Sequence, residues 1–488
     1  MNSIHSSTQI EVSMQSRQRM LRTDFARRLA FAIVFFDLAI VPFSAGQTSA
    51  PSVVTVLSAA SAPSIQTLAS AQKIMTLGEL QQMALQHNPT LAQAAANIRV
   101  AEGRKKQSGL YPNPTVGYEG EQIRGGSFRG GEQGFFIQQD IVTAGKLGLN
   151  RNVAEQDKKQ TEVAADEQKQ RVLTNVKLAY IQALAAQQMV ELRQNLKKLA
   201  QDAVETSHQL ANVGQADAPD VLEAEVEEQK ADLAVIQAEY SQQRLWNELA
   251  AVVGDPKLQT MRLDGNLEET PAIRADDLVE KLASESDLVK IAELEEKKAE
   301  ASLARAKHEP IPDLQIRAGM EENRELLDTT GRHTGLQGFA EVGVQLPVFN
   351  RNQGDIAAAR AQIERAQRDV ERIKLLLRER AAGVVQSYEY SRMAATRYKE
   401  QMIPRAQKAY DMYREKYRQM AAAYPQVLIA QRNLMELQVS YIHALESFAM
   451  NSAVLEAQLL TDGLTAPSGE IDGSVRDGVV MYGSAGQE

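Results

Sequence analysis

Most of the chain consists of two similar sequence copies, and this internal duplication limits the possible folds more than any other feature. The matching positions keep an offset of 198 residues in the first part of each copy and of 206 further along. The matched pairs are Leu80 and Leu278, Ala101-Glu102 and Ala299-Glu300, Pro112-x-Pro114 and Pro310-x-Pro312, Pro219 and Pro425, and Val221-Leu222 and Val427-Leu428. A register held over so many positions predicts two similar structural units, here 76–270 and 271–463.

Both copies are predicted to contain the same elements in the same order: a helix, two strands around a Gly-rich loop, a very long helix, a turn and a shorter helix. In the first copy these are a helix over 76–108, strands at about 114–122 and 133–142, a helix over about 149–212, a turn at 213–219 and a helix over 219–252. In the second copy they are a helix over 275–308, strands at about 312–321 and 336–346, an uninterrupted helix over 354–419, a turn at 420–426 and a helix over 425–460. The chain is therefore expected to be mainly α.

The two longest helices are too long for a single globular domain, because about sixty residues at 1.5 Å each span ~90 Å. The first of them carries two apolar seams with a period of seven residues. One seam is Leu178, Ala185, Leu192 and Leu199, and the other is Met189, Leu196, Ala203 and Leu210. Two seams predict packing against neighbours on two sides, as in a wall of antiparallel coiled-coil helices. An ordinary antiparallel bundle is the alternative.

The strand segments alternate apolar and polar residues. Leu314, Ile316 and Ala318 alternate with Gln315 and Arg317, for example. Strands of this kind are typical of a transmembrane β-barrel, although a soluble hairpin lying on a helix shows the same alternation. No stretch beyond the N-terminal region approaches about 18 apolar residues, so a membrane crossing would require a closed barrel. Four strands cannot close one, since barrels begin at about eight, and oligomerisation would be obligatory.

The N-terminus is predicted to be a secretory signal peptide over 1–46. Several arginines precede an apolar run from Leu29 to Phe43, and small residues follow it. A single membrane anchor is the alternative, but the run is short and contains Asp37. Residues 47–75 are rich in Ser, Ala, Thr and Pro and are expected to be a disordered linker. The C-terminal residues 464–488 are expected to be a flexible tail.

Composition excludes several classes of function. The formal net charge of −9 argues against a nucleic-acid partner, and the absence of cysteine excludes disulfides, thiolate nucleophiles and Cys-ligated metals. The six histidines are scattered without ligand spacing, and no phosphate-binding loop or nucleophile motif is present. We therefore expect no catalytic site, no cofactor and no bound metal: the chain is not predicted to be an enzyme.

Specific motifs lie beside the strands. Leu110-Tyr111-Pro112-Asn113-Pro114 precedes the first strand, and Gly145-Lys146 begins the long helix. In the second copy the string from Leu346 through Pro347, Val348, Phe349, Asn350, Arg351, Asn352 and Gln353 to Gly354 is followed by Ala357-Ala358-Ala359-Arg360-Ala361. With these motifs the chain resembles the outer-membrane efflux proteins of the TolC family from about 76 to 463. It is most similar to their cobalt–zinc–cadmium resistance branch.

The resemblance implies a homotrimer in the outer membrane. Three chains would each contribute four strands to one lipid-facing β-barrel, and their helices would continue it as an α-helical tunnel through the periplasm. The partners implied are a periplasmic adaptor (membrane fusion protein) and an inner-membrane pump of the resistance-nodulation-division class. The channel itself would be a passive duct, and the pump would supply the energy for transport.

The resemblance also assigns an adaptor-docking role to the first helix–helix turn. The family's Val-Gly-rich tip is matched by Val213, Gly214, Gln215 and Ala216, whereas the second turn, Gln419–Ala422, lacks the glycine. A structural role for Gly214 is an equal alternative, because a sharp turn after a helix often requires a left-handed residue.

In well-known members of the family, acidic residues at the second tip constrict the pore and select cations. Gln426 and Ile429 occupy the corresponding positions here, so an acidic ring from this copy is in doubt. Acids occur instead on the first tip. The candidate constriction residues are Asp217, Asp220, Glu223 and Gln426, although Asp217 and Asp220 are also good candidates for helix N-caps.

The leading hypothesis is a channel subunit of a tripartite efflux system that carries substrates out of the cell, heavy-metal cations being one candidate cargo. A duct for type I protein secretion or for multidrug export is an alternative in the same class. A periplasmic coiled-coil scaffold that never enters the membrane is an alternative of a different class.

Overall fold

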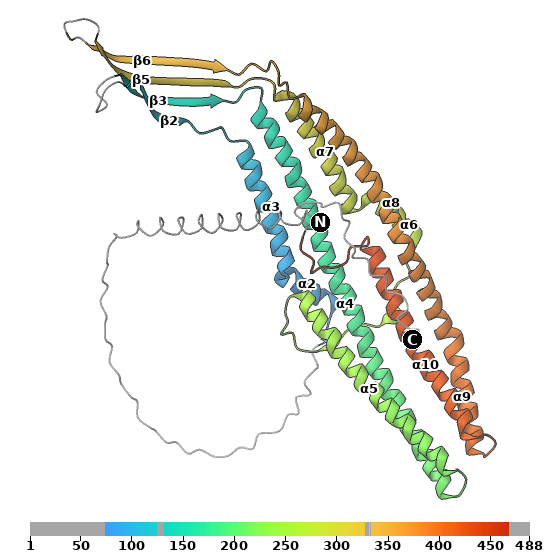
Figure 1. The fold of residues 1–488 in the computed structure, drawn as a ribbon. Coiled ribbons are helices and arrows are strands. Elements are labelled where there is room, and N and C mark those ends of the chain that lie inside the picture. Colours follow the sequence, from blue (N-terminus) through green and yellow to red (C-terminus); the bar gives the residue numbers. More distant parts are fainter. Residues whose placement is uncertain (1–73, 124–130, 327–330, 332, 468–488) are drawn as a thin grey trace, which may run out of the picture. The chain divides into compact units, whose positions relative to one another are not determined.

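The two sequence copies fold into the same succession of elements (Figure 1). The computed structural model describes residues 74–123, 131–326, 331 and 333–467, all of which belong to one unit, Ser70–Glu488. The first copy comprises α2 (Leu77–His87), α3 (Pro89–Ser108), β2 (Thr115–Glu121), β3 (Glu132–Ile141), α4 (Lys146–Asn212) and α5 (Ala218–Val253). The second comprises α6 (Ala275–Glu285), α7 (Asp287–His308), β5 (Leu314–Leu326), β6 (His333–Val344), α8 (Gln353–Arg397), a π-helical turn (Tyr398–Met402), α9 (Ile403–Arg418) and α10 (Tyr424–Glu456).

The predicted signal peptide (1–46) lies outside the described residues, as does most of the predicted linker (47–75) and of the tail (464–488). The last two residues of the predicted linker are not part of a linker. Ile74–Met75 forms β1, which pairs in parallel with β4 (Arg262–Leu263), and Met75 is buried. The backbone pairing and the buried side chain together hold the start of the first copy against the segment that links the two copies.

Each predicted first helix is broken in two, at corresponding positions of the two copies. Asn88 ends α2 and caps α3, where its Oδ1 accepts from Thr90 N at 2.9 Å. Proline at position 89 disfavours helical backbone at Asn88, which explains the break. Ser286, which lies 198 positions later, caps α7 through an Oγ that accepts from Leu288 N at 3.3 Å. The duplication therefore preserves a capping residue at the break.

The two long helices differ in continuity. Helix α4 runs for 67 residues without interruption, a length of about 100 Å. Its counterpart was expected to be uninterrupted over 354–419, and that expectation is wrong, because a π-helical turn separates α8 from α9. Pro404 lies in the first turn of α9 and has no N–H to donate, so the helix accommodates it with one wider turn.

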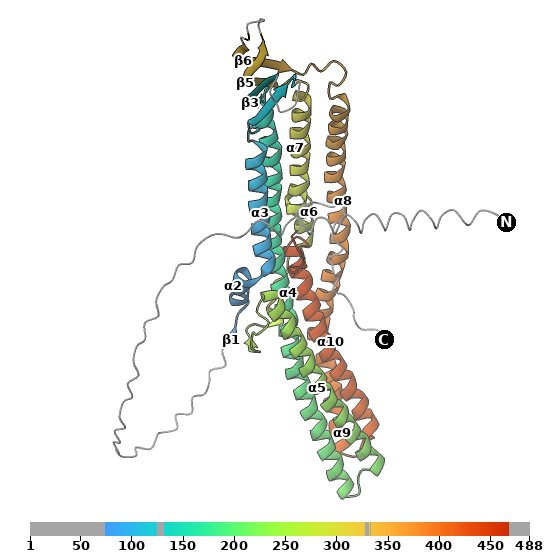
Figure 2. The same ribbon diagram turned by 60° about the vertical axis from the view of Figure 1, so that its left-hand side comes forward.

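Both copies contribute to one hydrophobic core in the middle of the helices. Helix α4 packs against α3, α5, α7 and α10, and α8 packs against α7 and α10 (Figures 1 and 2). Val176 and Leu178 of α4 lie in the same buried cluster as Leu377 and Tyr388 of α8 and Val454 of α10. Both predicted seams of α4 are used, since Leu178 and Ala185 on one and Leu196 on the other are buried.

The strands form one antiparallel sheet in the order β2-β3-β5-β6. Each copy supplies a hairpin, and the β3–β5 pair joins the copies in a register that runs from Glu132 opposite Asn323 to Ile141 opposite Leu314. Since β3 leads into the start of α4, the sheet lies at the end of the helices opposite the α4–α5 and α9–α10 turns (Figure 1). We call these two turns the first tip (213–217) and the second tip (419–423).

Candidate functional site at the tips and the sheet

The first tip is a helix-ending turn with a glycine in its left-handed position. Gly214 is left-handed at φ +73°, and its N–H donates to Ala211 O at 2.9 Å. The N–H of Gln215 reaches back to Leu210 O at 2.7 Å, which completes a Schellman motif. Val213, Gly214 and Gln215 are exposed and Ala216 is half-buried. Gly214 therefore has the structural role of the left-handed residue in this turn, and the neighbouring side chains remain accessible to a partner.

The second tip has the same hydrogen bonds with a different residue in the left-handed position. Met420, at φ +60°, donates to Tyr417 O at 3.0 Å, and Ala421 N donates to Lys416 O at 2.7 Å. Met420 is 206 positions after Gly214, as the duplication requires. The second tip therefore keeps the turn without the glycine, although a side chain in this conformation costs roughly 1–2 kcal/mol.

The acidic candidates lie together at the start of α5. Asp217 occupies the N-cap position, but its side chain makes no capping hydrogen bond, and Asp220 lies within the first turn. The prediction that Asp220 caps the helix is wrong, because its backbone is already helical and its N–H bonds to Asp217 O. Burial and the charges of Asp217 and Glu223 raise the pKa of Asp220. Gln426 is exposed in the corresponding turn of α10.

Sequence reasoning missed a cluster of tyrosines that joins the tips. Tyr410, Tyr417 and Tyr424 are all buried, and they pack with Ala224 of α5 and Val427 of α10. The rings of Tyr417 and Tyr424 lie 5.5 Å apart. Burial raises the pKa of Tyr424. The sequence does contain a pattern that predicts this cluster, because three tyrosines seven residues apart place their rings along one seam of a helix.

One face of the sheet is apolar and exposed. It carries residues from all four strands, with exposures between 51% and 72%. They are Val116, Tyr118, Phe135, Ile137, Met320, Leu336, Val342 and Val344. Contiguous apolar surface of this kind marks a site of contact with lipid or protein.

The opposite face of the sheet is polar and is organised around a single arginine. Arg317 forms ion pairs with Glu119 of β2 and Glu341 of β6. Its guanidinium lies 4.3 Å from the centre of the Phe136 ring and 5.4 Å from that of Phe339. The contacts therefore connect all four strands through one cation.

Two glycines make room for these rings. A Cβ at Gly117 would lie 2.5 Å from Phe136 Cζ, and one at Gly319 would lie 2.6 Å from Phe339 Cε1. The aromatic rings therefore lie flat over the backbone of neighbouring strands, as is typical of glycines rescued by cross-strand aromatics.

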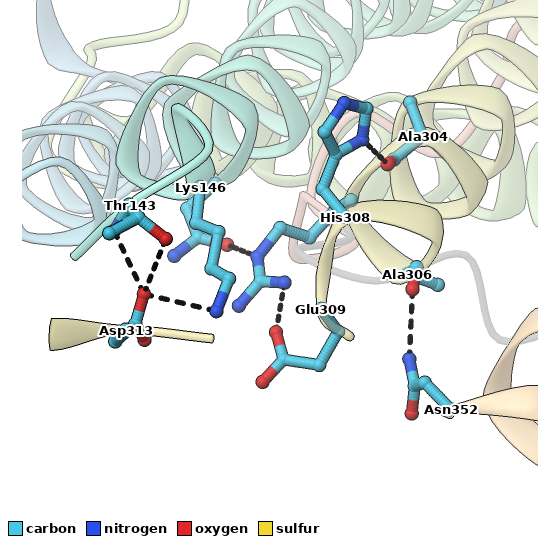
Figure 3. A network of polar contacts seen from close by, with 10 residues as sticks. Thr143, Lys146, Ala304, Ala306, His308, Glu309, Asp313 and Asn352 are labelled. Carbon is cyan, nitrogen blue, oxygen red and sulfur yellow. Dashed lines mark hydrogen bonds and ion pairs between the residues drawn. The ribbon is translucent and has the colours of Figure 1, made fainter. Parts of the chain in front are cut away.

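The strands meet the helices at a polar junction (Figure 3). Asp313, just before β5, accepts from Thr143 N at 2.8 Å and from Lys146 Nζ at 3.1 Å. Lys146 is the first residue of α4, and its side chain is only 4% exposed. Burial alone would raise the pKa of Asp313, but the hydrogen bonds from Thr143 and Lys146 lower it below the ordinary 3.8. The second copy's strand is thus attached to the first copy's long helix.

A second set of contacts in the junction explains the Asn-Arg-Asn motif before α8. Asn352 adopts the left-handed conformation at φ +57°, which Asn tolerates better than most residues. Its Nδ2 donates to Ala306 O at 3.0 Å (Figure 3). Arg305 Nε donates to Asn150 Oδ1 at 2.5 Å, so α7 is also connected to α4. The motif therefore positions the second long helix against the end of α7.

Neither a helical membrane span nor a cluster of potential metal ligands is present among the described residues. In 74–123, 131–326 and 333–467 no helix has the length and apolar character needed to cross a membrane. In the same part of the chain no three His, Cys, Asp or Glu side chains are grouped as potential metal ligands.

Comparison with known proteins shows a consistent set of relatives. Residues 80–255 match the family described as outer membrane efflux protein. The chain is 25% identical over 370 residues to the cobalt-zinc-cadmium resistance protein CzcC of Cupriavidus metallidurans, which covers 76% of this chain and 86% of CzcC.

Solved structures share the fold at lower identity. CusC, whose structures describe folding and transmembrane channel formation, superimposes with a TM-score of 0.67 at 15% identity, over 78% of this chain and 91% of CusC. The outer membrane protein VceC of Vibrio cholerae gives a TM-score of 0.63 at 19% identity, over 78% and 96%.

The chain is therefore similar to outer membrane efflux proteins, with a family match over residues 80–255. The solved structures share its fold of long helices and a four-stranded sheet. These findings agree with the family resemblance that the sequence motifs indicated, and the solved structures agree with it in fold. They do not test the residues assigned to docking or to the pore.

Opposite substitutions at the two tips test the role of left-handed backbone. Gly214→Ala should destabilise the first tip by about 1 kcal/mol, since a Cβ there meets no neighbour and only backbone strain acts. Met420→Gly should stabilise the second tip by up to about 1 kcal/mol, because relief of strain outweighs the greater entropy of unfolded glycine. Amide hydrogen exchange of the last turns of α4 and α9 measures both. Changes of the same sign in both variants would contradict this explanation.

The junction predicts a pH-dependent contribution to stability. Asp313→Asn should destabilise the folded chain by about 1 kcal/mol at neutral pH, because it leaves the buried Lys146 without its counter-charge, while solvent screens the partly exposed carboxylate. Since the folded pKa of Asp313 is lowered, its contribution is complete above pH 3.8 and disappears as the pH falls through the folded value. Urea unfolding midpoints of both proteins should therefore converge at acid pH. A constant difference would show that the charge is irrelevant.

Proposed function

We propose that the chain is one subunit of a homotrimeric channel, in which three sheets join edge to edge into a single transmembrane β-barrel. The support is the sheet itself. Within the described residues its outer strands, β2 and β6, each pair on one side only. An open edge leaves backbone N–H and C=O groups unpaired, which a bilayer does not tolerate. Closing the sheet with copies of the chain satisfies them.

The apolar face of the sheet is the lipid-facing side in this proposal, and the Arg317 face lines the lumen. The exposed residues of the apolar face, such as Val342 and Leu336, would be in contact with outer-membrane lipid. Glu119, Arg317 and Glu341 would then be in contact with water and cargo. This assignment accounts for both faces of the sheet with one arrangement.

The tips are the proposed periplasmic contacts. Val213, Gly214, Gln215 and Ala216 would dock a periplasmic adaptor, because their exposed turn is held rigidly by the Schellman hydrogen bonds. The adaptor would connect the channel to an inner-membrane pump of the resistance-nodulation-division class.

The constriction of the pore is proposed to lie at the start of α5 and α10. Asp217, Asp220 and Glu223 would supply acidic groups and Gln426 a neutral one. The missing side-chain cap at Asp217 supports this role, since its carboxylate is not used in a capping hydrogen bond. Three such clusters around a trimer axis would favour cations over anions.

Heavy-metal cations are the proposed cargo. The observation that carries this proposal is the similarity to a cobalt-zinc-cadmium resistance protein over most of both chains. The acidic groups at the first tip agree with a cationic cargo. No energy source is assigned to the chain itself, and transport would be driven by the pump.

A deletion strain tests the function directly. Loss of the chain should lower the tolerated concentrations of cobalt, zinc and cadmium salts severalfold and increase the metal retained in cells, and the wild-type gene should restore both. Elemental analysis of washed cells provides the measurement, with a strain lacking an unrelated outer-membrane protein as control. Unchanged metal tolerance together with increased sensitivity to organic drugs would replace this cargo with the multidrug alternative.

A charge placed on the apolar face tests the membrane arrangement. Val342→Lys should reduce insertion into the outer membrane, because a lysine facing lipid costs up to about 2–4 kcal/mol, and less the nearer it lies to the edge of the bilayer. Gln337→Lys, on the opposite face of the same strand, is the matched control and should insert normally. The yield of heat-modifiable trimers from outer-membrane fractions measures both. Equal yields of trimers from the two variants would contradict the assignment of the apolar face to lipid.

A further inference from the structure

A cavity lies between the two sequence copies, part of the way from the core to the tips. It has a volume of about 150 Å³ and is lined by α4, α5 and α10. A liquid water occupies about 30 Å³, so the cavity has room for a small polyatomic ion with some water. Its charged lining consists of Arg193 from α4, Glu227 and Lys230 from α5, and Arg432 from α10. Three cations therefore face one carboxylate.

The single carboxylate is already occupied. Glu227 Oε1 accepts hydrogen bonds from both Lys230 and Arg432. Burial would raise the pKa of Glu227, but these two partners together lower it. The nearby carboxylate of Asp232 is paired with Lys197. The lining thus retains an excess of two positive charges.

Arg193 is the cation of this lining that has no counter-charge among the described residues. No hydrogen bond or ion pair connects its guanidinium to any other described residue. Burial lowers the pKa of Arg193, and no carboxylate offsets that effect. A partly buried guanidinium without a partner carries a desolvation cost that an anion would remove.

A buried amide without a hydrogen-bond partner also lines the cavity. Gln431 lines the same cavity and is only 2% exposed, yet its Oε1 is buried without a hydrogen-bond partner. None of the hydrogen bonds among the described residues uses its side-chain nitrogen either. The two ends of such an amide can exchange places by rotation, so the nitrogen can donate into the cavity. Buried amides without partners are rare in folded proteins, and a bound water or ion can satisfy them.

We infer that this cavity is a binding site for a small oxyanion, held by Arg193, Lys230, Arg432 and the amide nitrogen of Gln431. Guanidinium groups bind tetrahedral and planar oxyanions through paired N–H donors, which suits phosphate, sulfate or a carboxylate. A cation is disfavoured by the excess positive charge, and an apolar ligand by the charged lining. The bound anion would bridge α4 of the first copy and α10 of the second. This inference does not depend on the identity of the cargo.

Titration of the purified full-length protein in detergent with inorganic phosphate tests the site. Ionic strength is held constant with sodium chloride, and binding is followed by calorimetry and by phosphorus NMR. One saturable site per chain is expected, with a thermal unfolding midpoint that rises as the site fills. Parallel titrations with sulfate and acetate define whether tetrahedral or planar anions are preferred.

Two variants with a matched control make the test specific. Arg193→Gln and Gln431→Leu should each weaken phosphate binding at least tenfold and remove the rise in unfolding midpoint. Lys198→Gln removes one exposed charge from the same helix outside the cavity and should change affinity less than twofold. If Arg193→Gln folds poorly, Arg193→Lys takes its place in the test. Because it keeps the positive charge, it should retain part of the affinity for phosphate. Absence of saturable binding for all three anions, or equal weakening by Lys198→Gln, would overturn the inference.

Discussion

The pairing of β3 with β5 is the contact on which the rest of the arrangement depends. Each copy alone supplies a two-stranded hairpin, which is at best marginally stable. Because β3 and β5 are antiparallel over ten paired positions, from Glu132–Asn323 to Ile141–Leu314, the two hairpins become one four-stranded sheet. The same register aligns the apolar residues of both copies on one face. A slip of one residue would move them to the other face, so the alternation itself fixes the pairing.

The register also determines where the helices begin. Since β3 ends at Ile141 and β5 begins at Leu314, the start of α4 and the end of α7 lie at the same end of the strands. The short connections on both sides are held by the Asp313 and Asn352 contacts. The long helices therefore leave the sheet from fixed points, and α4 on one side and α8 with α9 on the other carry their direction over tens of ångströms. The position of the tips is in this way a consequence of the strands.

Much of this architecture could be predicted from the sequence, because duplication and periodicity are properties of many residues at once. The offset between the copies indicated the order of elements, and the alternation in the strands indicated the two faces of the sheet. Local exceptions were harder to predict. The break at Asn88 required attention to one Asn-Pro pair, and the π-helical turn to one proline inside a strong helical pattern.

The candidate site was less predictable, because it depends on which helices become neighbours. The heptad spacing of Tyr410, Tyr417 and Tyr424 was visible, but not their contact with Ala224 from the other copy. Arg193, Lys230 and Arg432 lie on three helices with no shared motif. Only the packing of α4 against α5 and α10 reveals that these three cationic side chains outnumber the carboxylates in the cavity lining.

The two tips show how the copies diverged without losing their shape. The Schellman hydrogen bonds are the same at Gly214 and at Met420, so the turn is specified by the backbone and the packing of the flanking helices rather than by glycine. Once that is so, the side chains at each tip are no longer needed to form the turn. The first tip ends at the exposed Asp217 and leads into Asp220 and Glu223 of α5, whereas the exposed Met420 of the second tip lies between the buried Tyr417 and Tyr424. In the proposed channel, the first tip would therefore contact ions and partners, and the second would hold neighbouring helices together.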